Sequence, residues 1–263
     1  MRKPGWSGLR WMTTVPVALA LMLGAAAYGD SGSAADQTKE QAKVATASKV
    51  ADLEMKGDIA RARNNLLLAE DYFRQAVRLD PRNSVLYNKL GIAQLKNENM
   101  RGAQSSFAKA AKLDPKFAAA LNNLGAVACM QKKYSAATKY LKQALALDET
   151  NASVHVNLGE AWLGLGQMDR ALAEYSRALE IDGDVFAENA QGGVTARLKT
   201  PEQRGAAEYL VARMFAKRGN VERALEQLAK AKEDRYPHLK NVYSDQEFAV
   251  LWNDPRLQKI VTR

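Results

Sequence analysis

Apolar residues recur at three- and four-residue spacing through most of the chain between residues 50 and 185. This spacing places them on one face of a helix and is typical of amphipathic α-helices rather than strands. Near the middle of the chain it predicts a helix from about Ala118 to Gln131 and another from about Ser135 to Leu147, joined by a turn at 132–134. The pattern therefore predicts an all-α chain built from helix pairs.

Glycines fall at intervals of 34 residues, and twelve residues after each glycine comes an alanine. The two series are Gly57, Gly91, Gly125 and Gly159, and Ala69, Ala103, Ala137 and Ala171. A fixed period of this length is the signature of a repeat protein, in which one helix pair cannot bury its apolar face alone. We expect these small residues to lie where helices cross, because they let the two axes approach closely.

The second unit carries the clearest motif, SVLYNKLGIAQLKNENMRGAQSSFAKAAKLDP. It resembles the tetratricopeptide repeat family, with Leu90-Gly91, Ala103, Phe107, Ala110 and Pro115 at the family's positions. The resemblance covers four units, residues 50–83, 84–117, 118–151 and 152–185. It implies a right-handed α-solenoid whose concave inner surface is lined mostly by the first helix of each unit.

The remaining segments are assigned by their departure from this period. Residues 186–204 form an insertion, at the end of which Thr200-Pro201 is typical of a helix start. Residues 205–237 are a degenerate fifth repeat, and residues 238–263 are a helical cap for the last apolar face. Residues 30–49 are rich in Ala, Ser, Gln and Lys and are interpreted as a linker that is in part helical.

The N-terminus predicts export. Arg2, Lys3 and Arg10 precede a short apolar run at 15–27, which is the pattern of a signal peptide within residues 1–29. The alternative is an uncleaved inner-membrane anchor formed by residues 13–28, although this run is shorter than the roughly 20 residues that a spanning helix needs. We expect a periplasmic or secreted protein.

Candidate chemistry is sparse. A single cysteine, Cys129, excludes a disulfide within one chain and a multi-cysteine metal site, and it lies in an apolar helix. The two histidines, His155 and His238, belong to no catalytic motif. The sequence therefore predicts no enzyme, no cofactor, no metal and no small-molecule substrate.

The predicted first helices carry the candidate binding residues. By the family resemblance, residues just before each motif glycine, and one just after, face the concave groove: Asn88, Lys89, Asn122, Asn123, Asn157 and Glu160. In related repeats an asparagine ladder at such positions binds the main chain of an extended peptide, which suits an amide that both donates and accepts. The alternative is that these asparagines bind a neighbouring repeat or only water.

The charge is +9 over 263 residues, and the basic residues are interpreted as solvated helix faces interleaved with acids. The favoured function is a non-catalytic scaffold of the cell envelope that binds a peptide segment of a partner protein. The alternatives are a self-assembling structural protein, or a basic surface that binds nucleic acid or anionic lipid. Nucleic acid is the less favoured partner, and membrane contact is expected only through the N-terminal segment.

Overall fold

The computed structural model describes residues 34–183, 185 and 201–261. The expected signal segment and most of the expected insertion lie outside these residues. The chain divides into two compact units, residues 1–44 and 45–263. The described part of the first unit is the beginning of one helix, and all of its classified residues are exposed.

That helix, α1 (Ala34–Ala62), differs from the expected linker, because residues 34–49 are helical throughout. Its first half is rich in alanine, glutamine and lysine, which have high helix propensity. Ion pairs three residues apart, Asp36–Lys39 and Glu40–Lys43, add to it. From Ala45 onward the helix belongs to the second unit, where it supplies Leu53 and Ala60 to the core.

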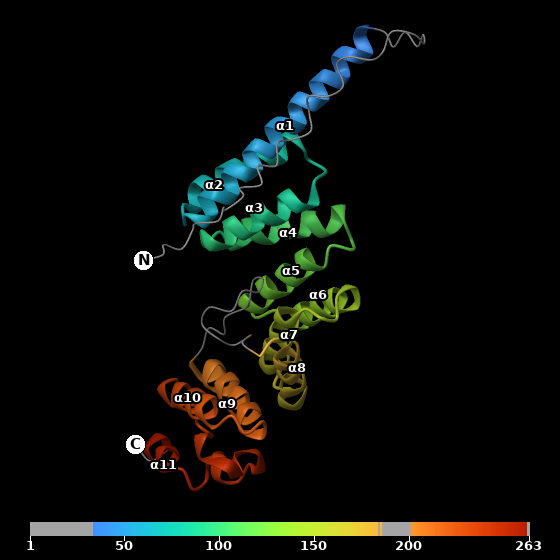
Figure 1. Cartoon of the computed structure of the whole chain (residues 1–263). Coiled ribbons are helices and arrows are strands. Elements are labelled where there is room, and N and C mark those ends of the chain that lie inside the picture. Colours follow the sequence, from blue (N-terminus) through green and yellow to red (C-terminus); the bar gives the residue numbers. More distant parts are fainter. Residues whose placement is uncertain (1–33, 184, 186–200, 262–263) are drawn as a thin grey trace, which may run out of the picture. The chain divides into compact units, whose positions relative to one another are not determined.

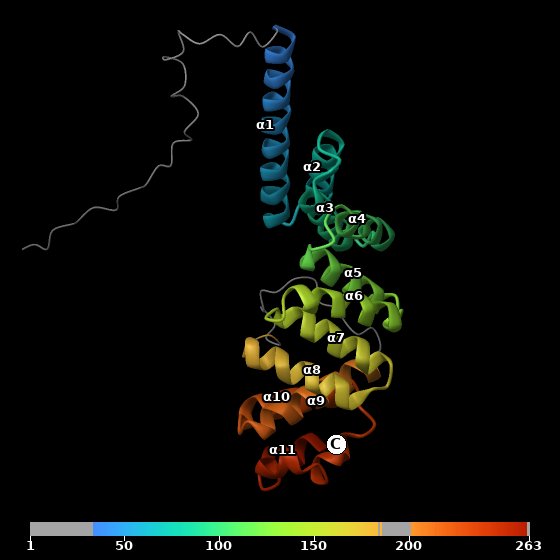
Figure 2. The same cartoon turned by 90° about the vertical axis from the view of Figure 1, so that its right-hand side faces the viewer.

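Within the second unit the helices follow one another as pairs, which Figures 1 and 2 show from two directions. After α1 come α2 (Leu66–Leu79), α3 (Ser84–Lys96), α4 (Met100–Leu113), α5 (Ala118–Met130), α6 (Tyr134–Leu147), α7 (Ala152–Gly164) and α8 (Met168–Ile181). Each helix contacts the next one in the chain from α2 to α8. The predicted all-α solenoid of helix pairs is confirmed. We call α1, α3, α5 and α7 the A helices, and α2, α4, α6 and α8 the B helices.

The turn inside each pair repeats one backbone feature. A residue with positive φ occupies the same register in all four repeats: Asn64, Glu98, Lys132 and Gly166, with φ between 57° and 73°. Only glycine adopts this conformation without steric cost. Asparagine tolerates it better than most residues, so the second and third turns, with Glu98 and Lys132, are the ones that keep the geometry against the preference of their residues.

The small residues of the period lie at the crossings of the A and B helices. The four alanines are completely buried. A Cβ added to Gly125 would lie 2.4 Å from Cγ of Leu141, and one added to Gly91 would lie 2.6 Å from the Phe107 ring. The B-helix side chain thus fills the space that each glycine leaves on the A helix.

The C-terminal part packs α9 (Pro201–Lys217) against α10 (Val221–Glu233). The helix begins at Pro201, four residues before the bound expected for the fifth repeat. Two 3-10 helices, η1 (Leu239–Tyr243) and η2 (Gln246–Leu251), and α11 (Pro255–Val261) follow. Phe248, Leu251 and Leu257 from these short elements are fully buried.

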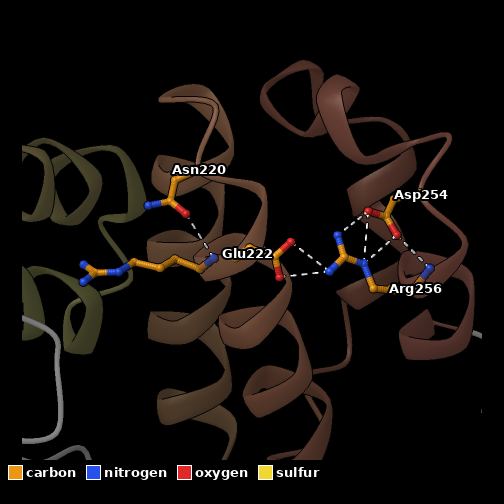
Figure 3. A network of polar contacts seen from close by, with 5 residues as sticks. Asn220, Glu222, Asp254 and Arg256 are labelled. Carbon is orange, nitrogen blue, oxygen red and sulfur yellow. Dashed lines mark hydrogen bonds and ion pairs between the residues drawn. The ribbon is translucent and has the colours of Figure 1, made fainter.

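Figure 3 shows how α11 is tied to α10. The guanidinium of Arg256 bonds both carboxyl oxygens of Glu222 at 2.9 Å and also the carboxyl group of Asp254, just before α11. The side-chain oxygen of Asn220 caps α10 by accepting a hydrogen bond from the main-chain N–H of Arg223. These contacts are exposed, so they orient the tail, while its buried apolar residues hold it.

Candidate functional site

Neighbouring A helices are joined by polar side-chain contacts at a constant spacing of 35 residues. They are Glu54 to Lys89, with 2.7 Å between Oε1 and Nζ; Asn88 to Asn123, with 2.8 Å between Oδ1 and Nδ2; and Asn122 to Asn157, also 2.8 Å. Each contact links one register position to the position one further along in the next repeat. We call these three contacts the polar ladder.

Burial makes the amide contacts of the polar ladder energetically important. Asn122 and Asn123 are each 3% exposed, and Asn157 is completely buried. A buried amide without a partner costs stability, whereas a paired one is nearly neutral or favourable. The contacts between repeats therefore satisfy groups that the packing of the A helices has removed from water.

The first contact of the polar ladder is ionic. Lys89 binds Glu54 and also Asp58, both on α1. Burial lowers the pKa of Lys89, but the hydrogen bonds that Lys89 donates to the two carboxylates, together with their negative charges, outweigh this effect, so the pKa is raised overall. Lys89 thus stays charged and fastens the second repeat to the first.

Five of the six residues expected to face a groove belong to the polar ladder. The structure places Asn88, Lys89, Asn122, Asn123 and Asn157 in contacts between repeats, which is the alternative that the sequence left open. Sequence reasoning missed Glu54 and Asp58 as partners of Lys89. The recurrence of an acceptor and a donor 35 residues apart is the pattern that could have revealed the ladder.

The sixth residue, Glu160, lies apart from the polar ladder in a group of buried titratable side chains. Its Oε2 atom is buried and has no hydrogen-bond partner among the described residues, and burial raises the pKa of the carboxyl group well above its ordinary value. Burial and then the Glu160 charge raise the pKa of the Cys129 thiol. Burial and then the Glu160 charge also raise the pKa of the Tyr175 hydroxyl, and Cys129 adds a smaller effect in the same direction.

The chemistry of this group is inert. Cys129 donates to the main-chain oxygen of Asn157 over 3.7 Å, and its raised pKa keeps it a thiol. A thiol is a poor nucleophile compared with a thiolate. In the described part of the chain, no three His, Cys, Asp or Glu side chains gather into a group able to hold a metal ion.

His155 is also held by its surroundings. Its Nδ1 lies 2.7 Å from Oε2 of Glu174 on α8, and its Nε2 lies 3.2 Å from the main-chain oxygen of Glu149. Both ring nitrogens are engaged within the fold, so this histidine joins α7 to its neighbours. The sequence placed His155 in no catalytic motif and did not reveal these partners.

Partly exposed apolar side chains remain on the A helices next to the polar ladder. Ile92 and Leu95 on α3 and Met130 at the end of α5 are half-buried, whereas the asparagines of the polar ladder beside them are buried. We call these three residues the A-helix strip. Half-buried apolar side chains of this kind can pack against a segment of another protein.

The described helices give no membrane span, since none is both long enough and apolar enough to cross a bilayer.

Comparison with known proteins agrees with the repeat geometry. Family models described as tetratricopeptide repeat match residues 53–83, 88–152 and 128–192. No curated protein sequence matches this chain.

Among solved structures, the crystal structure of MamA protein is similar at 20% identity and a TM-score of 0.51, over 76% of this chain and 97% of that one. MamA 41-end from Desulfovibrio magneticus RS-1 matches at 19% identity and a TM-score of 0.51, over 71% of this chain and 95% of that one. These likenesses show the fold. The family matches, together with the four helix pairs, show that the chain belongs to the tetratricopeptide repeat family of non-catalytic protein-interaction scaffolds.

Proposed function

We propose that this chain is a scaffold of the cell envelope that holds an extended or helical segment of a partner protein along the A helices of the second and third repeats. The observation that carries the proposal is the A-helix strip. Ile92, Leu95 and Met130 keep part of their apolar surface in water, although the same helices bury their asparagines. An apolar segment of a partner would remove that surface from water and gain free energy.

The polar ladder supports the same proposal in a different role from the one expected. Because its amides bind each other between repeats, it holds neighbouring A helices at a fixed offset. A rigid surface loses little conformational entropy when a partner binds. We therefore assign direct contact with the partner to the A-helix strip, and the positioning of this strip to the polar ladder.

Site-specific crosslinking tests this assignment. A photoreactive amino acid is placed at Leu95 or Met130, and the matched control places it at Gln143, an exposed residue of α6. We expect both strip positions to crosslink to one segment of one protein, identified by mass spectrometry, and Gln143 not to. A synthetic peptide of that segment should bind the purified chain, and Leu95→Glu should weaken it by at least about tenfold.

Two results would oppose the assignment. Crosslinks of equal yield from Gln143 would place the contact elsewhere, and peptide binding that Leu95→Glu leaves unchanged at unchanged helicity would remove the strip from the site. The envelope location is tested separately by fusing residues 1–29 to a reporter enzyme that is active only after export.

A further inference from the structure

The net positive charge of the chain is concentrated in its middle, where acids are few. From Lys96 to the end of α6 at Leu147 there are nine lysines and arginines and only two acids, Glu98 and Asp114. The helices α4, α5 and α6 contain no acid at all. The expectation that basic and acidic residues alternate is therefore wrong for this stretch.

All nine of these cations are exposed, and none forms an ion pair with a described residue. The neighbouring B helices differ: α2 pairs Arg74 with Glu70, and α8 pairs Arg177 with Glu180. An excess of positive charge thus belongs to the second and third repeats alone among the four.

The cations of α4 and α6 lie opposite the residues that these helices bury. On α4 the buried residues include Ala103, Phe107 and Ala110, and the exposed cations occupy the other face. The same holds for α6, where Ala137, Leu141 and Ala144 are buried. We call the following exposed residues of α4, of the turn after it and of α6 the basic belt: Arg101, Lys109, Lys112, Lys116, Lys139 and Lys142.

Aromatic rings hold two members of the basic belt. The Nζ atom of Lys142 lies 4.9 Å from the centroid of the Trp162 ring, and that of Lys109 lies 6.0 Å from the centroid of Tyr87. Both contacts are of the cation–π type, which restrains a side chain without neutralising its charge. Two of the six charges of the belt are therefore held in restrained positions.

We propose that the basic belt docks the chain on a membrane surface that carries anionic lipid headgroups. Five of its six residues are lysines, which act as point charges and suit a diffuse field of headgroups, whereas arginine is preferred for paired recognition of one phosphate. Clusters of this size are typical of segments attracted to anionic lipids.

Two other kinds of partner fit the belt less well. Protein interfaces are depleted in lysine and have an apolar core, but from Lys96 to Leu147 the only strongly exposed large apolar residue is Leu147. Proteins that bind single-stranded nucleic acid offer exposed aromatic rings for base stacking, and this stretch has none among its strongly exposed residues. Charge without either feature is what a lipid surface requires.

Vesicle sedimentation with the full chain tests the proposal. The vesicles are phosphatidylcholine alone or phosphatidylcholine with about 30% phosphatidylglycerol, an amount chosen to give a negative surface potential. The belt variant combines Arg101→Gln, Lys112→Gln, Lys116→Gln and Lys139→Gln. The control variant removes the same charge elsewhere on the surface, through Lys49→Gln, Lys217→Gln, Arg218→Gln and Lys240→Gln.

We expect the unaltered chain to prefer the anionic vesicles by at least about tenfold at low salt and to lose this preference as salt is added, since each cation near such a surface strengthens binding about fivefold. The preference of the belt variant for the anionic vesicles should be at least about tenfold weaker than that of the unaltered chain, and the preference of the control variant less than about threefold weaker. The N-terminal segment, with Arg2, Lys3 and Arg10, is the same in all three chains, so its own attraction to anionic vesicles does not alter the comparison between the belt and control variants.

Three results would overturn the proposal. The first is equal binding to both vesicle types, and the second is an equal loss in the belt and control variants. The third is tighter binding to a DNA duplex than to the anionic vesicles at the same salt, which would assign the belt to nucleic acid.

Discussion

Removing one amide of the polar ladder should destabilise the chain by more than an exposed substitution does. In Asn123→Ala the Oδ1 atom of Asn88 loses its donor, which is 2.8 Å away, while the surrounding helices still exclude water. An unsatisfied buried acceptor costs about 1–3 kcal/mol. The loss of side-chain contacts is smaller, so we expect a decrease of about 2 kcal/mol in the free energy of unfolding.

A double-mutant cycle isolates the contact itself. Asn88→Ala, Asn123→Ala and the double variant are each unfolded in urea and followed by circular dichroism at 222 nm. The double variant leaves neither partner unsatisfied, so it should be less unstable than the sum of the two, with a coupling energy of about 1 kcal/mol. With a dependence on urea of about 2–3 kcal/mol per molar, each single variant should shift the midpoint by roughly 0.7–1 M.

Gln143→Ala is the control, since Gln143 is exposed on α6 and its change should stay within about 0.5 kcal/mol. A coupling energy within about 0.3 kcal/mol of zero would refute the reasoning, because additive effects mean that the two amides do not interact. The same result would return both asparagines to the role of ligand contacts.

Three further predictions concern other buried sites. Gly125→Ala should destabilise by about 1–2 kcal/mol in urea unfolding, because the displacement of Leu141 outweighs the gain in helix propensity; unchanged stability would contradict the close approach of the helices. Burial and then the charge of Asp234 raise the pKa of Glu208 from 4.5 to about 7, so its contribution to stability is complete below pH 4.5 and is lost as the pH rises through 7. Glu208→Gln should therefore flatten the pH dependence of the melting temperature and raise the free energy of unfolding by about 1–2 kcal/mol above pH 7, after allowance for partial solvent exposure. A melting temperature that falls as much between pH 4.5 and pH 7 in the variant as in the unaltered chain would count against this prediction. Cys129 should react with a thiol reagent only after denaturation, because burial and Glu160 raise its pKa; rapid reaction of the native chain would show that the thiol is open.

The sequence reveals the helix pairs because the period of the small residues is a direct consequence of how the helices cross. The residues at positions 125 and 137 must be small, since Leu141 and its neighbours fill the space beside Gly125 and Ala137. The helix over residues 34–49 was harder to foresee. Alanine, glutamine and lysine favour a helix but also compose flexible linkers, and no apolar stripe in these residues separates the two.

The candidate site could be predicted only in part. The repeat register identifies Asn122 and Asn123 as special, but their partners depend on the offset between neighbouring A helices, which a periodicity of 34 does not contain. The basic belt was missed for another reason. A net charge averaged over the chain conceals a stretch in which the acids are missing from three consecutive helices.

The polar ladder also makes the third repeat a self-complementary module. Its α5 carries an acceptor amide for the repeat that follows, in Asn122, and a donor amide for the repeat that precedes, in Asn123. The ladder stops at Val156, which holds the register of Asn122 in α7 and has no polar side-chain atom. A tandem duplication of residues 118–151 would therefore supply one more rung of the same kind. Lengthening of the array at this point needs no compensating change in its neighbours, whereas an extra copy of the fourth repeat would place Val156 against an asparagine.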